Sequence, residues 1–102
     1  LLRRGTPLKG VRFKLMQKGV GEDDIDTALA AATEDTPEPD LAAAAALARR
    51  RRLGPYAAPD KRAERRDKDL ATLARAGFDY GTARRVIEAE TVDDLTRMLD
   101  ER

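Results

Sequence analysis

Residues 73–87 read LARAGFDYGTARRVI, and this stretch decides the fold because it predicts a helix, a sharp corner and a second helix. Gly77 favours the end of the first helix, since glycine adopts the left-handed conformation of a helix C-terminus without steric cost. Phe78 follows, where an apolar side chain can fold back onto the helix that it leaves. Asp79 can accept backbone N–H groups at the start of the next helix. The apolar residues after it recur at helical spacing.

The same pattern occurs 58 residues earlier, in residues 15–29, which read LMQKGVGEDDIDTAL. Gly19 matches Gly77 and Val20 matches Phe78. The apolar residues that follow also match in register: Ile25, Ala28 and Leu29 with Ala83, Val86 and Ile87. This fixed offset predicts an internal repeat, although two unrelated helix–glycine–helix corners could look alike because glycine so often ends helices. We expect residues 8–32 and 63–90 to share one backbone shape, with Val20 and Phe78 in equivalent buried corners.

The rest of the chain predicts an all-α fold of tandem three-helix repeats, one complete and one N-terminally truncated. Residues 1–33 form the truncated unit, in which 1–5 end a helix, Thr6-Pro7 starts the next one and 22–32 form another. Residues 34–40 are an acidic linker with two prolines. Residues 41–102 form the complete unit, with helices at about 40–53, 60–76 and 80–89, and a C-terminal helix that Thr91 can cap.

The composition argues against an enzyme. The chain has 102 residues and contains no Cys, His or Ser, so the usual nucleophiles and bases of covalent catalysis are missing. The acidic cluster Glu22, Asp23, Asp24 and Asp26 matches no calcium loop and suits the positive end of a helix dipole. We therefore expect no cofactor, no metal and no small-molecule substrate. No apolar run approaches the roughly 20 residues that span a bilayer, and no signal peptide is evident, so we expect a cytoplasmic protein without a membrane partner.

The strongest functional signal is a basic stretch. Residues 49–75 hold ten basic and four acidic residues, a net charge of +6 in a chain of net charge +1. The predicted partner-binding residues, which we call the basic ridge, are Arg49, Arg50, Arg51, Arg52, Lys61, Arg62, Arg65, Arg66 and Lys68. A Gly54-Pro55 turn joins their two helices, so we expect antiparallel neighbours on which the two basic groups converge.

The basic ridge has two interpretations. Scattered Lys and Arg suit a solvated helix face, but four adjacent arginines repel one another and suit planar contacts with carboxylate or phosphate. The target could be nucleic acid or an acidic protein groove. Only Tyr56 interleaves an aromatic ring, so recognition by base stacking is poorly supported.

Taken together, these segments resemble the RecX family, the bacterial modulators of the RecA recombinase. The matching text begins with Arg4-Gly5-Thr6-Pro7-Leu8 and Leu15-Met16-Gln17-Lys18-Gly19-Val20. It continues with the Ala-rich helix at 41–48 and its following arginines, and ends with Leu73-Ala74-Arg75-Ala76-Gly77-Phe78. The order and separation of the two glycine corners make the likeness specific, whereas each corner alone is weak. The alanine density at 42–48 and the length of the acidic linker depart from the family pattern.

The resemblance implies the second and third three-helix repeats of such a protein, with the first absent. It also implies a non-enzymatic monomer that binds RecA–DNA filaments, with possible phosphate contacts to DNA, and inhibits RecA's ATPase, strand exchange and SOS co-protease activity. Two alternatives stay open. Residues 73–99 also look like a ubiquitin-associated-type module that binds partner proteins, and the chain could be a stand-alone helical DNA-binding protein.

Overall fold

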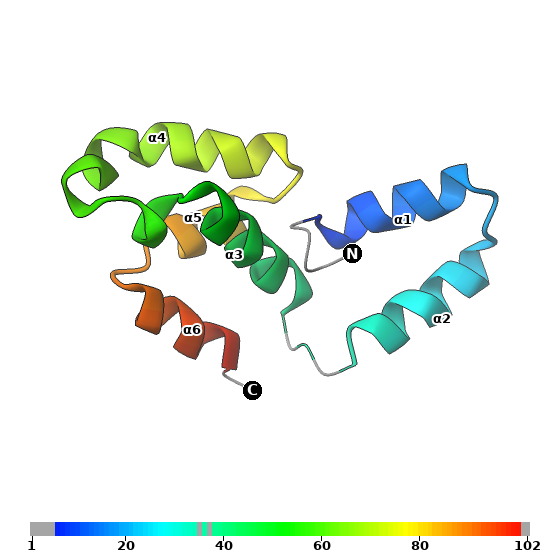
Figure 1. The fold of residues 1–102 in the computed structure, drawn as a ribbon. Coiled ribbons are helices and arrows are strands. Elements are labelled where there is room, and N and C mark those ends of the chain that lie inside the picture. The colour runs from blue at the N-terminus through cyan, green and yellow to red at the C-terminus, as the bar shows by residue number, and fades with distance from the viewer. Residues whose placement is uncertain (1–5, 35, 37, 101–102) are drawn as a thin grey trace.

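The computed structural model describes residues 6–34, 36 and 38–100, and every regular element in that part of the chain is helical (Figure 1). The elements, in order, are α1 (Leu8–Gln17), α2 (Glu22–Ala32), α3 (Pro39–Arg51), a 3-10 helix (Gly54–Tyr56), α4 (Pro59–Arg75), α5 (Tyr80–Ile87) and α6 (Val92–Asp100). The all-α prediction is confirmed. The expected end of a helix at residues 1–5 lies outside the described residues. None of the described helices combines the length and the apolarity needed to cross a membrane.

The two glycine corners have the same backbone. Gly19 and Gly77 both have a positive φ, of 82° and 105°. Their N–H groups donate to the carbonyls of Met16 and Ala74, and the next N–H groups, of Val20 and Phe78, donate to those of Leu15 and Leu73. Because each of these hydrogen bonds recurs at the offset of 58 residues, the corner itself is repeated, and the shared backbone shape of residues 8–32 and 63–90 stays a prediction. Asp79 caps α5 as expected, since its Oδ1 accepts the N–H of Thr82 at 2.7 Å.

One apolar core lies among α3, the end of α4, α5 and α6. Leu41 and the alanines of α3 pack on Leu73, Val86 and Leu95, each of which is no more than 2% exposed. The small alanine side chains let α3 lie close to α5, because they keep the two backbones from being pushed apart. Phe78 is 4% exposed and belongs to this core.

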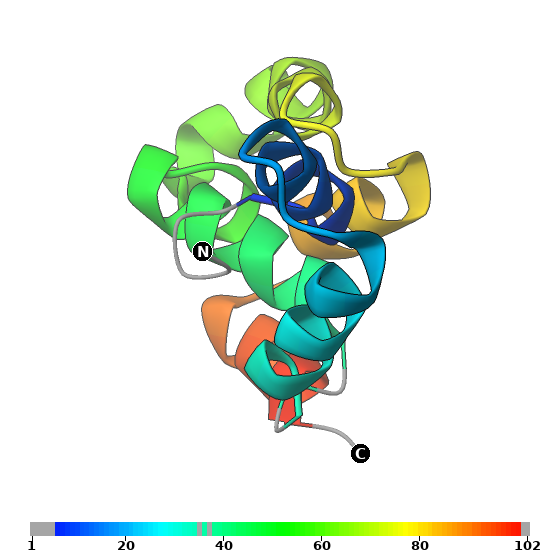
Figure 2. The ribbon, with the colours of Figure 1, turned by 90° about the vertical axis from the view of Figure 1, so that its right-hand side faces the viewer.

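The helices α1 and α2 form an arm that projects from this core (Figure 1), and Figure 2 views the molecule from the side on which the arm lies. Pro7 meets the Gly77 corner, where a Cβ on the glycine would lie 3.1 Å from Pro7 Cγ. The corner at Gly19 has no such neighbour within 4 Å. Val20 is therefore only half-buried whereas Phe78 is buried, so the expectation of two equally buried corners was wrong. The start of α1 packs over the Gly77 corner, whereas no described residue packs against Gly19 in the same way.

The acidic segment before α3 fastens the arm and the core together. α3 begins at Pro39, so the last two residues of the expected linker are helical. Asp40 Oδ1 accepts the N–H of Leu8 at 2.8 Å and so caps α1 from another helix. The sequence had placed the start of this helix at Thr6-Pro7, and its N-cap residue Pro7 supplies no side-chain cap of its own. Glu38 makes a two-pronged pair with Arg85 of α5, at 2.5 and 3.0 Å.

Candidate functional site: a cationic groove

The basic ridge is divided between two helices. Arg49, Arg50 and Arg51 form the last turn of α3, and Arg52 follows as its left-handed C-cap. Cations are favourable there because the carbonyl end of a helix carries partial negative charge. The remaining ridge residues, Lys61, Arg62, Arg65, Arg66 and Lys68, lie on α4.

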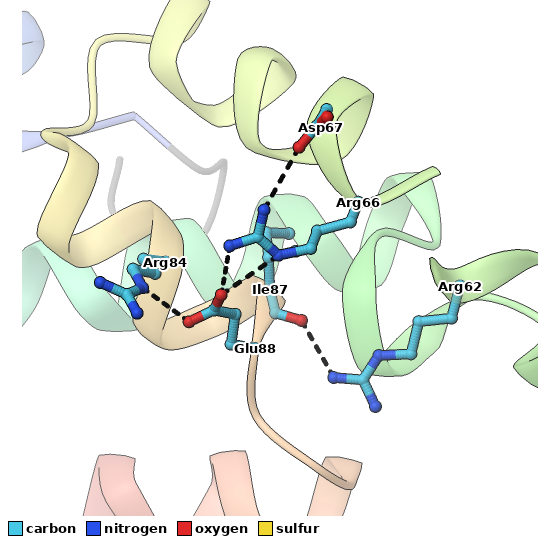
Figure 3. A network of polar contacts seen from close by, with 6 residues as sticks. All are labelled: Arg62, Arg66, Asp67, Arg84, Ile87 and Glu88. Atoms are coloured by element: carbon cyan, nitrogen blue, oxygen red, sulfur yellow. Dashed lines mark hydrogen bonds and ion pairs between the residues drawn. The ribbon is translucent and has the colours of Figure 1, made fainter. Parts of the chain in front are cut away.

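Arg62 is a part of the fold. Its guanidinium donates a hydrogen bond to the carbonyl of Ile87 at 2.9 Å, as Figure 3 shows. It also donates to the carbonyl of Glu90 at 2.7 Å and contacts the carbonyl of Ala89. These carbonyls belong to the last residue of α5 and to two residues just after it, where no helical N–H is left to bond them. Arg62, which the sequence placed in the basic ridge, is therefore engaged with the end of α5.

Arg66 is occupied in a second network beside Arg62 (Figure 3). It contacts Glu88 and pairs with Asp67 at 3.2 Å, while Arg84 donates to the other oxygen of Glu88 at 2.7 Å. The hydrogen bond from Arg66, and then that from Arg84, lower the pKa of Glu88 below its ordinary value. This network ties α4 to α5, so Arg66 also contributes to the fold.

Asp69 is one of the four acidic residues in the basic stretch, and it is only 1% exposed. Its Oδ2 accepts the N–H of Gly54 at 3.0 Å, and its Oδ1 lies 4.0 Å from Arg65 Nε. The carboxylate thereby holds the 3-10 helix against α4. The repeat offers a sequence signal for the burial of Asp69, because the matching residue 58 positions earlier is the buried Val11.

Two ridge residues of α3, Arg50 and Arg51, face a groove of about 630 Å³ between α1, α3 and α4. The ridge residues on α4 are not among the residues that line it. Arg75 at the end of α4 and Lys14 of α1 complete its charged lining. We call this site the cationic groove. Its other lining residues are Thr6, Pro7, Gly10, Phe13, Gln17, Leu47, Thr72 and Ala76.

The cationic groove carries uncompensated positive charge. Its lining includes four basic side chains and no carboxylate. None of these four forms an ion pair with another described residue. The fold therefore concentrates cationic groups from three helices around one open space, which raises the local concentration of anions.

The acidic start of α2 was interpreted as helix-dipole stabilisation. Glu22, Asp23 and Asp24 lie in the first turn of α2, as that interpretation requires. Asp26 pairs with Arg12 of α1. In the described part of the chain, no three acidic side chains are grouped so as to hold a metal ion.

Comparison with known proteins identifies the family. The chain is 42% identical over 86 residues to the regulatory protein RecX of Myxococcus xanthus strain DK1622, an alignment that covers 83% of this chain. It is 35% identical over 89 residues, or 87% of this chain, to the regulatory protein RecX of Agrobacterium fabrum. The alignments cover 45% of each relative, so the chain spans about half the length of these proteins. No family model matches the chain, and no solved structure gives a significant match. With two such relatives aligned over most of its length, and with the glycine corner present twice in its backbone, the chain belongs to the RecX family.

Proposed function

We propose that this chain is a RecX-like regulatory protein that binds RecA–DNA filaments through its cationic groove and inhibits RecA's ATPase, strand exchange and SOS co-protease activity. It acts as a monomer and without catalysis of its own. The observation that carries the proposal is the uncompensated charge of Lys14, Arg50, Arg51 and Arg75 in a member of a family of regulatory proteins. A filament that holds DNA offers phosphates and acidic protein surface, and both attract such a groove.

The binding residues proposed for the groove differ from those of the basic ridge. Arg50 and Arg51 belong to both, whereas Lys14 and Arg75 line the groove but are not ridge residues. Arg62 and Arg66 are excluded because they hold α5 and its C-terminal turn. The repeated corner also weighs against the ubiquitin-associated alternative, since a single module of that kind would contain it once.

The test is the DNA-dependent ATPase of RecA, measured with and without the purified chain. The groove variant changes Arg50, Arg51 and Arg75 together to Gln. A matched control changes the exposed ridge residues Arg49, Lys61 and Lys68 together to Gln, which removes the same charge outside the groove. Thermal melting confirms that both variants are folded.

We expect the parent chain and the control to inhibit the ATPase and the groove variant to inhibit it much less. We also expect added salt to weaken inhibition by the parent, because exposed charges are screened. A parent chain without effect on the ATPase would contradict the proposed function. Inhibition that survives in the groove variant but is lost in the control would return the binding role to the basic ridge.

A further inference from the structure

Phe13 is an aromatic side chain for which the fold provides no cover. Its side chain is 60% exposed. Phe13 belongs to the arm, which has few buried apolar residues, and burial of its ring would stabilise the arm. It lines the cationic groove next to Lys14, on the α1 side, and faces the space that Arg50 and Arg51 bound on the α3 side. The sequence did not suggest this combination, because 37 residues separate Phe13 from Arg50.

An exposed aromatic ring among unpaired cations is the arrangement that binds single-stranded nucleic acid. The cations attract the phosphates, and the ring supplies a flat surface on which one base stacks. A duplex is a poorer ligand, because its bases are stacked on one another and present no face to a side chain. An acidic peptide would satisfy the charges but has no necessary use for the ring.

The size of the groove agrees with a short stretch of one strand. Its volume of about 630 Å³ lies in the range of about 300–1,000 Å³ that encloses one ligand of drug-like size. A nucleotide or two is of that size.

We propose that the cationic groove binds single-stranded nucleic acid directly, with phosphates at Arg50, Arg51, Arg75 and Lys14 and one base stacked on Phe13. This site goes beyond the proposed function, because it requires no recombinase. It uses the same groove, so the experiments are done with oligonucleotides and without RecA.

The first experiment exploits the absence of tryptophan from the chain. In Phe13→Trp, the indole at the groove becomes the only tryptophan, and stacking of a base on it quenches its fluorescence. The matched control is Tyr80→Trp, because Tyr80 lies on α5, is 61% exposed and does not line the groove. We expect an oligothymidine of about 10 nucleotides, within the site sizes known for single-strand binding, to quench the first variant but not the second.

The second experiment measures affinity. Phe13→Leu should weaken oligothymidine binding about 5- to 150-fold, the equivalent of roughly 1–3 kcal/mol for one stacked base. Tyr80→Leu should leave affinity unchanged. An abasic oligomer should bind the parent and Phe13→Leu equally, because it has phosphates but no base. Changing Arg50 and Arg75 together to Gln should weaken the binding of both oligomers. It should also reduce the slope of log affinity against log salt concentration by about 1.4. Oligothymidine and oligouridine, compared side by side, show whether DNA or RNA is preferred.

Three results would overturn the inference. They are an unquenched indole at position 13 when binding is saturated, a duplex that binds as tightly as the single strand, and a polyglutamate peptide that displaces the oligonucleotide and quenches equally well. RecA ATPase inhibition distinguishes the two proposals. If the chain inhibits RecA but binds no free oligonucleotide, this inference fails and the proposed function stands.

Discussion

At the scale of single residues, two left-handed positions shape the end of α3. Arg52 has φ +57° and Gly54 has φ +56°. At Gly54 glycine is required twice over, because a Cβ would lie 2.9 Å from Ile87 Cα. Position 52 holds arginine instead of glycine, and a left-handed residue that carries a Cβ lowers stability by roughly 1–2 kcal/mol. The chain retains arginine there in spite of this cost.

Arg52→Gly should therefore stabilise the protein by about 0.5–1 kcal/mol, since the relieved strain is partly offset by the greater freedom of glycine in the unfolded chain. Arg49→Gly is the control, because Arg49 is helical. It should destabilise by about 1 kcal/mol. Urea unfolding measures both, and a loss of stability in Arg52→Gly would contradict the assigned strain.

Phe78 and Val20 occupy the same position of the repeated corner but differ in burial. Phe78→Ala should lower the free energy of unfolding by roughly 3–5 kcal/mol, because it empties an aromatic site in the core. Val20→Ala should cost less than about 2 kcal/mol, because the side chain is half-buried. Chemical denaturation tests the pair. A loss under about 1 kcal/mol for Phe78→Ala would mean that its ring does not support the core.

At the scale of elements, we expect the contact between α4 and α5 to weaken in acid. Hydrogen bonds from Arg66 and then Arg84 lower the pKa of Glu88 below its ordinary value of 4.5, and Arg85 lowers that of Glu38. A carboxylate whose pKa is lower in the folded than in the unfolded chain stabilises the fold above the unfolded value. That stability is lost as the pH falls through the folded pKa. Acid should therefore loosen α5 from α4 and α3.

We expect the melting temperature of the parent to fall as the pH drops below 4.5, and Glu88→Gln to show a smaller fall. At pH 7 the variant should melt below the parent, because the charged pairs with Arg66 and Arg84 are lost. Melting curves recorded between about pH 7 and pH 3 cover this range. Parallel curves for the two proteins would show that Glu88 does not contribute to the acid sensitivity.

At the scale of the whole molecule, the arm of α1 and α2 supplies one wall of the groove, and its first helix is capped by a residue of α3. Asp40 of α3 accepts the N–H of Leu8. Asp40→Ala leaves that N–H without its partner, so the start of α1 should open more easily. The effect should stay within the arm, because the core of α3 to α6 contains neither α1 nor α2.

Hydrogen exchange measures this prediction. In Asp40→Ala the amides of α1 should exchange about 5-fold faster, the equivalent of about 1 kcal/mol for a lost cap, while those of α5 keep their rates. Asp60→Ala is a control in the first turn of α4. It should leave α1 unchanged. Equal acceleration in α1 and α5 would mean that the arm and the core open as one unit.

The sequence by itself determined the parts of this protein that depend on neighbouring residues. The glycine corners, the Asp79 cap and the helical pattern are local, because their hydrogen bonds join residues at most five positions apart. Two members of the groove, Arg50 and Arg51, were likewise evident in the basic ridge. Because these interactions join residues that are close in the chain, they can be predicted from the amino-acid sequence.

Only the tertiary structure decided which basic residues remain available. Arg62 lies 25 residues from Ile87, whose carbonyl it bonds, and nothing in its own segment marks that partner. Phe13 and Lys14 join Arg50, Arg51 and Arg75 in one groove only because α1 is capped by Asp40 and abuts the Gly77 corner. Such contacts follow from how helices pack, and packing is set by the shapes and volumes of all the buried side chains together.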